Sequence, residues 1–530
     1  MIWNETTDVI VVGCGFAGAT AAIAAHDAGA EVVLLEKMPE PGGISICSGG
    51  GLRMASDAQA AFAYLQATNA GTTPDEVLQV LAEGMVELPE QVEALAKINR
   101  AVVARREAPA IYPFEGQEVF GFCLIESIPD FDAQAAYPNV RTLGTGVLLF
   151  KVLHDNLDAR GIAIRCNTAA ERLITGAGKE VLGLRVNEGG QTATIQARRG
   201  VILACGGFEA NPAMQAQYWE EKPVLATTFF GNTGDGIRMA LDAGADLWHM
   251  WHYHGTYGFR TPDGGMGIRT KRLPDWPPNR EQSAQEAADA RETRDVLDTA
   301  SGNRPAVPMP WILLDRDGHR FMNEYEPYMQ DTGHRGLARF RPETQDFPRI
   351  PCWLIADENG RQQFAWGQPL YNGRDINLMW SPDNLAEVES GLIGRADSLP
   401  ELAQALGVEP DALQQALSRW NTSCQQEYDP DFRRPPSSMM PVEQPPFYYA
   451  PIWPLVSNTQ GGPVHDAAQH ILDPYGDPIP RLFSAGELGS AFGHLYLSGG
   501  NLAECLITGR IAGREAAALP AWVGVPNETP

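Results

Sequence analysis

Residues 8–37, DVIVVGCGFAGATAAIAAHDAGAEVVLLEK, decide the fold. The apolar run at 8–12 predicts a buried strand, the alanine-rich stretch from Phe16 predicts a helix, and residues 31–37 predict a second buried strand. Between the first strand and the helix stands Gly13-Cys14-Gly15-Phe16-Ala17-Gly18. Such glycines permit a tight turn and let a pyrophosphate approach the free N–H groups at the amino end of the helix. The stretch therefore predicts a βαβ unit that binds a dinucleotide.

The end of the second strand and the loops after it narrow the choice of dinucleotide. Glu36 follows the glycines by about 20 residues, where a carboxylate accepts hydrogen bonds from ribose hydroxyls and repels a 2′-phosphate. FAD or NAD is therefore favoured over NADP. Two further glycine-rich loops, at 41–45 and 48–51, are absent from nicotinamide-binding domains and suit the ribityl chain and ring of a flavin. Four later segments agree with FAD: ACGGFE at 204–209, NTGDG at 232–236, SAGE at 484–487 and SGGNLAECLITGRIAG at 498–513.

Composition bounds the class of protein. The chain has 530 residues, too many for one hydrophobic core, and its apolar share of 44% and charged share of 20% are those of a globular enzyme. The formal charge of −26 opposes binding to nucleic acid or to anionic membranes. No apolar run reaches the roughly 18 residues that span a bilayer, so we expect a cytoplasmic protein with no transmembrane anchor. The eight cysteines are scattered, which favours reduced packing residues over metal or haem ligands.

The nucleotide-binding character returns near the carboxyl terminus, which predicts a discontinuous domain. We expect an α/β fold in which a Rossmann-like FAD domain of the glutathione-reductase type carries an inserted α+β cap. The expected bounds are 1–257 and 457–530 for the FAD domain and 258–456 for the cap. Patterning further predicts helix over about 58–104, a meander of strands over 162–188, and an exposed, Pro-rich and charged insertion over about 259–310.

Taken together and in this order, the glycine-rich segments resemble those of the FAD-dependent fumarate reductase and 3-ketosteroid dehydrogenase superfamily, over nearly the whole chain. Members with covalent flavin carry a His after the second glycine-rich loop, whereas residues 42–52 read GGISICSGGGL, so the resemblance implies non-covalent FAD. It also implies that Glu487 binds the ribityl hydroxyls, that Asp235 lies near the flavin, and that Gly500 starts a helix aimed at the pyrimidine edge. A helix amino terminus there stabilises the negative charge of reduced flavin. The implied cofactor-binding residues are Gly13, Gly15, Phe16, Ala17, Gly18, Glu36, Lys37, Gly43, Ser45, Ser48, Gly50, Gly51, Ala170, Ala204, Gly206, Asp235, Glu487, Asn501 and Leu502.

Fumarate reductases resemble this chain in GHRFMNE at 318–324 and in TQGGP at 459–463. Those enzymes bind two carboxylates with a His in H-T-x-G-G and an Arg in N-R-x-G-G-N. Here Asn458 and Leu497 stand at those places, and a buried carboxylate facing Leu497 would be unpaired at a cost of several kcal/mol. Arg361 resembles the proton-donating Arg of fumarate reductases; its alternative interpretation is a structural Arg after a strand. A dicarboxylate substrate is disfavoured.

Two hydroxyl groups stand beside the position at which fumarate reductases have the carboxylate-binding Arg, and hydroxyl groups suit a neutral ketone substrate. Tyr496 and Ser498 flank Leu497, and Y-x-S-G-G resembles the Δ4-dehydrogenases of 3-ketosteroids more than the Δ1-dehydrogenases. In the cap, NEYEPY at 323–328 resembles the N-E-S-x-P-Y pattern of these enzymes, with Tyr325 in place of the Ser and Tyr328 as the residue that reaches the active site.

The resemblance also implies the roles of these residues. The Tyr496 hydroxyl and the Gly500 N–H would bind the 3-keto oxygen as an oxyanion hole. Tyr328, with Ser498 relaying its proton, would take the proton from the α carbon while the β carbon delivers hydride to flavin N5. Because an unperturbed tyrosine has a pKa of about 10, this role requires a stabilised phenolate. The alternative for Tyr328 is a buried ring with a satisfied hydroxyl.

The stretch LWHMWHYHGTY at 247–257 is dense in aromatic residues and histidines. The spacing of His249, His252 and His254 fits no standard metal-ligand pattern, so core or substrate-pocket packing is favoured and no metal is expected. The sequence thus predicts a dehydrogenase that introduces a double bond next to a ketone, with a small apolar ketone as substrate and an external electron acceptor. The resemblance implies that this substrate is a steroid. The alternatives are an ene-reductase of the fumarate or urocanate type and a non-catalytic flavin-binding redox protein.

Overall fold

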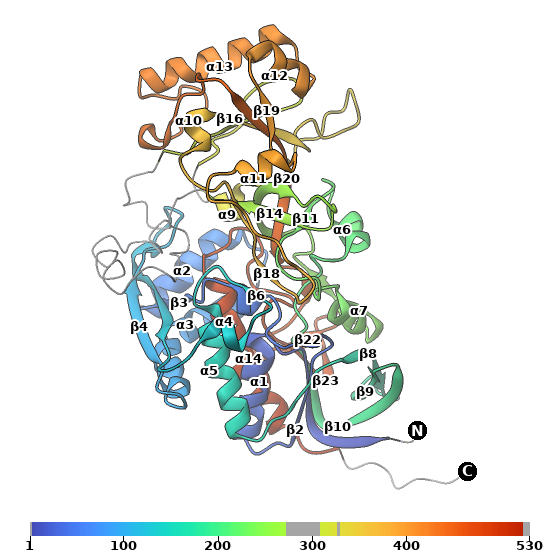
Figure 1. Cartoon of the computed structure of the whole chain (residues 1–530). Helices are drawn as coiled ribbons and strands as arrows, with labels where there is room; N and C mark the ends of the chain where they lie inside the picture. The colour runs from blue at the N-terminus through green and yellow to red at the C-terminus, as the bar shows by residue number, and fades with distance from the viewer. Residues whose placement is uncertain (1–2, 272–307, 326–328, 523–530) are drawn as a thin grey trace. The chain divides into compact units, whose positions relative to one another are not determined.

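The computed structural model describes residues 3–271, 308–325 and 329–522 (Figure 1). The chain forms two compact units, the first from residues 1–214, 229–253 and 458–530 and the second from 215–228 and 254–457. The sequence assigned 215–228 to the FAD domain. This segment belongs instead to the second unit, because its strand β11 (Leu225–Ala226) pairs in parallel with β20 (Phe447–Thr459).

The centre of the first unit is a parallel sheet with strand order β23-β10-β1-β2-β7. Val12 of β1 lies opposite Leu35 of β2 and Leu203 of β10, so the carboxyl ends of these three strands meet at one edge. The next residues at that edge come from the glycine-rich turn, from Glu36 and from Ala204. The strands are β1 (Glu5–Val12), β2 (Val32–Leu35), β7 (Ile164–Arg165), β10 (Gln191–Leu203) and β23 (Pro478–Ser484), with β22 (His470–Leu472) antiparallel beside β23.

Helices α1 (Phe16–Asp27) and α14 (Gly500–Ala518) lie side by side in the first unit (Figure 1). Two glycines of α14 permit the close approach. A Cβ atom on Gly509 would lie 2.5 Å from the carbonyl oxygen of Ala17, and one on Gly513 would lie 2.4 Å from that of Ala21. The two helices that border the cofactor edge of the sheet are therefore fixed to each other through backbone contacts.

The helix expected over 58–104 is interrupted. The structure has α2 (Ala58–Asn69), α3 (Asp75–Ala96) and then strand β4 (Val102–Glu107). Ala70 adopts a left-handed backbone with φ 59°, and Pro74 precedes α3, so the helical pattern cannot run through. The predicted meander is present as β8 (Thr168–Thr175), β9 (Val181–Glu188) and the first part of β10, paired in antiparallel fashion.

The remaining elements of the first unit are short or lie around the sheet. They are β3 (Leu52–Ala55), β5 (Phe120–Ser127), α4 (Ala133–Ala136), β6 (Val140–Arg141), α5 (Gly146–Ala159), α7 (Asp235–Asp242), β12 (Leu247–Trp248) and β21 (Gly462–Pro463). Helix α6 (Pro212–Tyr218) crosses the boundary between the units.

The second unit is built on a mainly antiparallel sheet of order β15-β16-β20-β13-β14-β17, with β11 and β19 also pairing with β20. Helices α12 and α13 cover an apolar cluster around Trp420. The elements are β13 (Tyr253–Arg260), β14 (Gly267–Thr270), β15 (Ile312–Leu314), α9 (Met329–Thr332), β16 (Cys352–Asp357), α10 (Glu358–Arg361), β17 (Gly367–Gln368), β18 (Tyr371–Asn372), α11 (Leu385–Glu389), β19 (Gly394–Ala396), α12 (Leu399–Leu406) and α13 (Pro410–Gln425).

The insertion expected over 259–310 is not exposed in its first part. Phe259 and Ile268 belong to β13 and β14 and are fully buried in the core of the second unit, so this expectation is wrong for 259–271. Its alternation was obscured by the turn residues between the two strands. Residues 272–307 lie outside the described part of the chain. Within 3–271, 308–325 and 329–522, no helix combines the length and apolar character that crossing a bilayer needs.

Candidate active site

A cavity opens at the carboxyl edge of the parallel sheet, within the first unit. The turn after β1, the end of β2 and the segment after β10 all contribute to its wall, because the strand register brings them together. The cofactor residues expected from the sequence that line it are Gly13, Gly15, Phe16, Ala17, Glu36, Lys37, Gly43, Ser45, Ala170, Ala204, Gly206, Asp235 and Glu487.

Other expected cofactor residues do not line this cavity: Gly18, Ser48, Gly50, Gly51, Asn501 and Leu502. Gly18 serves packing, since a Cβ atom there would lie 1.8 Å from the carbonyl oxygen of Gly13. Gly50 and Gly51 lie against Thr145 and the ring of Phe122. Ser48 accepts a hydrogen bond from the Gly50 N–H, and Asn501 and Leu502 form the first turn of α14.

The cavity fits the pyrophosphate and adenosine ribose of FAD. Gly15 is the N-cap of α1, and no side chain caps this helix, so its first N–H groups are available to an anion. A Cβ atom at Gly15 or Gly43 would meet no backbone closer than about 4 Å, so these glycines leave open space on the cavity side. Glu36 accepts N–H groups from Cys14 at 3.0 Å and from Met38 at 2.9 Å, which fixes its carboxylate at the end of β2.

Lys37 and Asp235 neutralise each other at the cavity wall. The Lys37 Nζ donates to Asp235 Oδ2 at 2.5 Å and to Thr233 Oγ1 at 2.8 Å. Burial alone would raise the pKa of Asp235, but the hydrogen bond and charge of Lys37 together with the hydrogen bonds from Thr233 and Arg238 outweigh it, so the pKa of Asp235 lies below its usual range. The wall of the cavity therefore contains an ionised Lys37–Asp235 pair, to which Arg238 adds a second ion pair with Asp235.

A buried polar network continues from the cavity and includes two residues that the sequence reasoning did not single out, Glu209 and Asn232. The Asn232 amide donates to Glu209 Oε1 at 2.7 Å and to Glu487 Oε2 at 3.4 Å. The Thr459 N–H donates to Glu487 Oε1 at 2.9 Å. Burial raises the pKa of both Glu209 and Glu487, and for Glu209 the neighbouring Glu487 charge adds to this. Glu209 and Asn232 stand in the glycine-rich segments ACGGFE and NTGDG, so their place in these segments was the signal that could have identified them.

A second network orders the amino end of α14. The Asn501 amide nitrogen donates to Gln460 Oε1, Ser490 Oγ and Glu504 Oε2, each at 3.0 Å. Glu504 Oε1 accepts the Ala491 N–H at 2.7 Å. Burial raises the pKa of Glu504 to about 7, although these donors favour its ionised form. Asn501 thus acts in this structure as a buried link between the helix and the segment before Tyr496.

The residues expected to bind a carbonyl lie along one turn. Tyr496 and Leu497 are buried, with 5% and 2% of their surfaces exposed, and Ser498 is half-buried. Gly499 caps α14 in a left-handed conformation with φ 74°. The Gly500 N–H donates to the Leu497 carbonyl with an N···O distance of 2.6 Å, so an oxygen ligand would share this N–H or replace that carbonyl.

Arg53 lies behind this turn and was missed by the sequence reasoning. It is fully buried, its Nε donates to the Ser498 carbonyl at 2.7 Å, and its Nη1 donates to the Ala108 carbonyl at 2.7 Å. Its guanidinium lies 3.9 Å from the centre of the Phe122 ring. The available signal was a cation two residues after the SGGG loop at 48–51.

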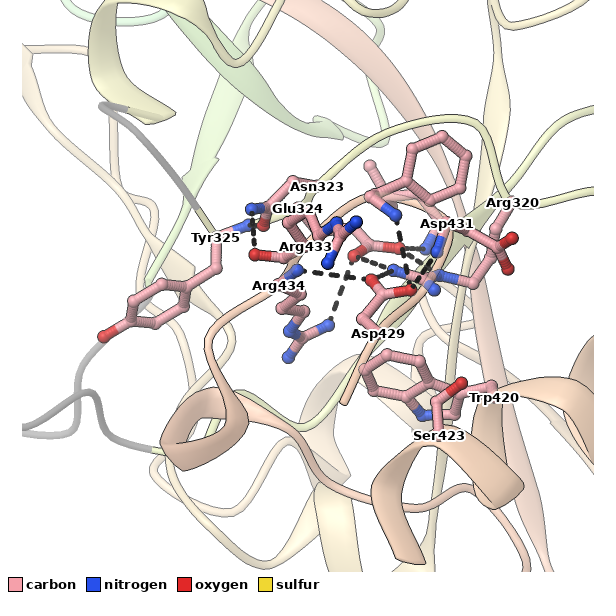
Figure 2. Close-up of polar contacts among 12 residues, drawn as sticks. Arg320, Asn323, Glu324, Tyr325, Trp420, Ser423, Asp429, Asp431, Arg433 and Arg434 are labelled. Carbon is pink, nitrogen blue, oxygen red and sulfur yellow. Dashed lines mark hydrogen bonds and ion pairs between the residues drawn. The ribbon is translucent and has the colours of Figure 1, made fainter. Parts of the chain in front are cut away.

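In the second unit, the NEYEPY motif begins at a buried ion cluster shown in Figure 2. Glu324 accepts hydrogen bonds from Arg320 Nε at 3.0 Å and Nη2 at 2.9 Å, and from Arg434 at 3.3 Å. Arg320 also reaches Asp429 at 3.2 Å. Burial disfavours the Glu324 charge, but the two arginines outweigh it and lower the pKa of Glu324. The motif thus anchors the chain up to Tyr325, whereas Tyr328 lies outside the described residues.

Arg361 uses three of its five guanidinium N–H groups in bonds within the second unit. Its Nη2 and Nε donate to Glu358 at 2.6 and 3.0 Å, and its Nη1 donates to the Asp383 carbonyl at 2.7 Å. These contacts hold the end of α10 against a neighbouring loop of the second unit. The geometry agrees with the structural interpretation of Arg361.

Comparison with known proteins agrees with the site. Residues 8–502 match the family described as FAD binding domain. Urocanate reductase of Eggerthella lenta is 27% identical, covering 97% of this chain and 75% of that protein. The 3-oxosteroid 1-dehydrogenase of Mycobacterium tuberculosis is 26% identical, covering 95% of this chain and 97% of that protein.

Among solved structures, a 3-ketosteroid Δ1-dehydrogenase from Sterolibacterium denitrificans, in complex with 1,4-androstadiene-3,17-dione, has a TM-score of 0.77 at 24% identity. The match covers 97% of this chain and all of that one. The likeness in fold therefore extends over both units of the chain. The family match, together with the glycine-rich turn at 13–18 and the hydrogen-bonded Glu36, shows that this chain belongs to the FAD-binding-domain family and is an FAD-dependent oxidoreductase.

Proposed function

We propose that the protein is a dehydrogenase of CH–CH groups that introduces a double bond next to a ketone, most specifically the Δ4 bond of a 3-ketosteroid. The observation that carries the proposal is the turn at 496–500, where buried Tyr496 and Leu497 stand and no carboxylate-binding Arg does. A hydroxyl donor suits a ketone oxygen, and an apolar Leu would oppose a buried carboxylate.

In this proposal the protein polarises the ketone and removes a proton. The Tyr496 hydroxyl donates to the 3-keto oxygen, with the Gly500 N–H as second donor, which stabilises enolate character and acidifies the α carbon. Tyr328 takes the α proton and Ser498 relays it; both assignments rest on the motif resemblance. Bound FAD would supply the acceptor for the hydride that leaves the β carbon, and an external acceptor would take up the electrons.

The geometry of Arg361 disfavours the ene-reductase alternative. Three of its five guanidinium N–H groups are bonded to Glu358 and to the Asp383 carbonyl, which is typical of a structural arginine, whereas a proton donor to an alkene would have to direct a remaining N–H at the substrate. The similarity to a urocanate reductase is the reason to test this alternative. The 3-oxosteroid 1-dehydrogenase relative supports the ketosteroid class, while the Tyr496-Leu497-Ser498-Gly499-Gly500 segment favours Δ4 over Δ1.

The test is anaerobic mixing of the FAD-loaded protein with a saturated 3-ketosteroid. We expect loss of the yellow colour of oxidised flavin and formation of the Δ4-3-ketone, identified by mass and by comparison with Δ1 and Δ4 standards. A product unsaturated only at C1 would refute the Δ4 assignment. Unchanged flavin with the steroid, together with reoxidation of chemically reduced protein by fumarate or urocanate, would establish the ene-reductase instead. No change in either experiment would favour a non-catalytic flavoprotein.

A further inference from the structure

Four successive backbone carbonyls in the first unit, those of residues 489–492, each accept a hydrogen bond from a buried side chain. Three of the donors are histidines, and the fourth carbonyl is shared by an amide and a hydroxyl. The contacts are His465 Nε2 to Gly489 O at 2.9 Å, His249 Nδ1 to Ser490 O at 2.8 Å, Asn69 Nδ2 and Thr73 Oγ1 to Ala491 O at 2.8 and 2.9 Å, and His252 Nδ1 to Phe492 O at 2.8 Å.

The histidines are deeply buried, with 3% of His465, 6% of His249 and 1% of His252 exposed. An extended run of carbonyls without backbone partners is costly to bury, so these donors satisfy a segment that belongs to no helix or strand. The packing is tight, since a Cβ atom on Gly493 would lie 2.5 Å from His249 Nε2. The histidine-rich stretch noted in the sequence therefore contributes hydrogen-bond donors to a loop.

The second ring nitrogen of His249 and of His465 also faces a carbonyl, and a neutral ring, which burial favours, donates to only one of its two. The second nitrogen of His249 lies 3.0 Å from the Thr72 carbonyl, and that of His465 lies 2.9 Å from the Asp466 carbonyl. His252 differs, because its Nδ1 holds Phe492 and so acts at the end of the segment nearest the substrate turn. The three residues tie one loop to the segment at 249–252 and to the segment at 465–466.

Phe492 connects this loop to the proposed carbonyl site. Its ring packs edge-on against the Tyr496 ring, with centroids 5.6 Å apart at an interplanar angle of 79°. The tip of the same ring occupies the space in front of Gly500, where an added Cβ atom would lie 2.4 Å from Phe492 Cζ. Displacement of Phe492 would therefore move both donors of the proposed oxyanion hole.

We propose that His249, His252 and His465 form a clamp on the carbonyls of 489–492, and that this clamp positions Tyr496 and Gly500 through Phe492. The effect on the oxyanion hole rests on the proposed function, whereas the clamp itself rests only on the hydrogen bonds. The histidines are positioning residues, since each acts on the loop rather than on substrate. An oxyanion donor displaced by about 1 Å loses much of its effect, roughly 10²-fold in rate.

The test compares His252→Ala with His252→Asn in the FAD-loaded protein. An asparagine amide can place an N–H near the position of the histidine Nδ1, so it can restore the bond to Phe492, whereas alanine cannot. His26→Ala is the matched control, because His26 is a half-exposed residue at the end of α1 outside the clamp. Hydrogen exchange of peptide 489–500 reports the loop directly, and steady-state kinetics with a 3-ketosteroid report the site.

We expect His252→Ala to speed amide exchange in 489–500 by about tenfold or more and to lower kcat by about 10- to 100-fold, with KM within about threefold. His252→Asn should recover most of both losses, and His26→Ala should change neither. Unchanged exchange in His252→Ala would overturn the clamp. Faster exchange with normal kcat would overturn its positioning role, and so would equal losses in the alanine and asparagine variants. A wild-type protein without ketosteroid turnover would refute the proposed function, while the exchange result would still decide the clamp.

Discussion

The carboxylate of Glu36 accepts the amide N–H of Cys14 at 3.0 Å. The acidic residue at the end of β2 is therefore bound directly to the glycine-rich turn that follows the neighbouring strand β1. This bond couples the ribose-binding residue to the pyrophosphate-binding turn. Glu36→Ala should therefore weaken FAD binding by about 10- to 100-fold, the effect of losing hydrogen bonds to a charged acceptor. FAD titration of the apoprotein, followed by quenching of flavin fluorescence, measures this. Glu31→Ala, at an exposed position before the same strand, should leave the affinity unchanged.

Tyr496→Phe should lower kcat for a 3-ketosteroid by roughly 10²-fold or more, because it removes one hydroxyl donor from the developing oxyanion. Reduction of the flavin by dithionite should be unaffected, since no cofactor contact is removed. Stopped-flow absorbance of the flavin measures both. Tyr475→Phe is the control, because Tyr475 is 91% exposed. Near-normal turnover in Tyr496→Phe would contradict the assigned role.

Arg361→Gln should retain ketosteroid turnover within about threefold while lowering the melting temperature, since Arg361 bonds Glu358 and Asp383. Differential scanning fluorimetry and initial rates measure the two effects. A loss of activity of three orders of magnitude with an unchanged melting temperature would instead identify Arg361 as a proton donor.

Gly509→Ala should lower the free energy of unfolding by roughly 1–3 kcal/mol, because the new methyl group would lie 2.5 Å from the Ala17 carbonyl and separate α1 from α14. Thermal unfolding with FAD at a fixed concentration measures the change. Gly178→Ala should be close to neutral, since a Cβ atom there meets nothing within 4 Å. Equal melting temperatures for the two variants would contradict the close helix contact.

The buried Glu504 carboxyl predicts a loss of stability as pH rises to neutral. Burial raises the pKa of Glu504 to about 7, above its unfolded value, so its contribution is complete below the unfolded pKa and is lost as pH rises through 7. Between about pH 5 and 7 the loss should approach about 1.4 kcal/mol per pH unit for this group, and above pH 7 it should level off. Burial lowers the pKa values of His249 and His465, whose contribution is complete above their unfolded pKa and is lost as pH falls. The difference in melting temperature between the wild type and Glu504→Gln should therefore change between pH 5 and 7 and stay constant between pH 7 and 9.

The local part of the fold could be predicted because it depends on short segments. The strand, turn and helix at 8–27 and the acidic residue at the end of β2 follow from spacing alone, and the family resemblance and FAD are confirmed by the match over 8–502. The interruption after Asn69 was missed because the residues on both sides of it favour helix. The strands β13 and β14, which pair with each other, were missed because the turn residues between them obscured their alternation.

The contacts behind the candidate site could not be predicted, since each joins residues far apart in the chain. Arg53 meets Ser498 across 445 positions, and His252 meets Phe492 across 240. Periodicity identifies a buried face but does not say which carbonyl a buried donor will find. The histidines could therefore be assigned to packing, while the segment that they bind required the tertiary structure.

Arg53 also sets the electrostatic potential near the beginning of α14. A guanidinium does not lose its proton at any pH at which the protein is folded, so the positive potential behind the Ser498 carbonyl is permanent. It adds to the partial positive charge at the beginning of α14. An electron-rich, anionic form of a cofactor or substrate near that helix end is favoured over its neutral form. The midpoint potential of the bound flavin should accordingly fall when Arg53 is replaced by an uncharged residue.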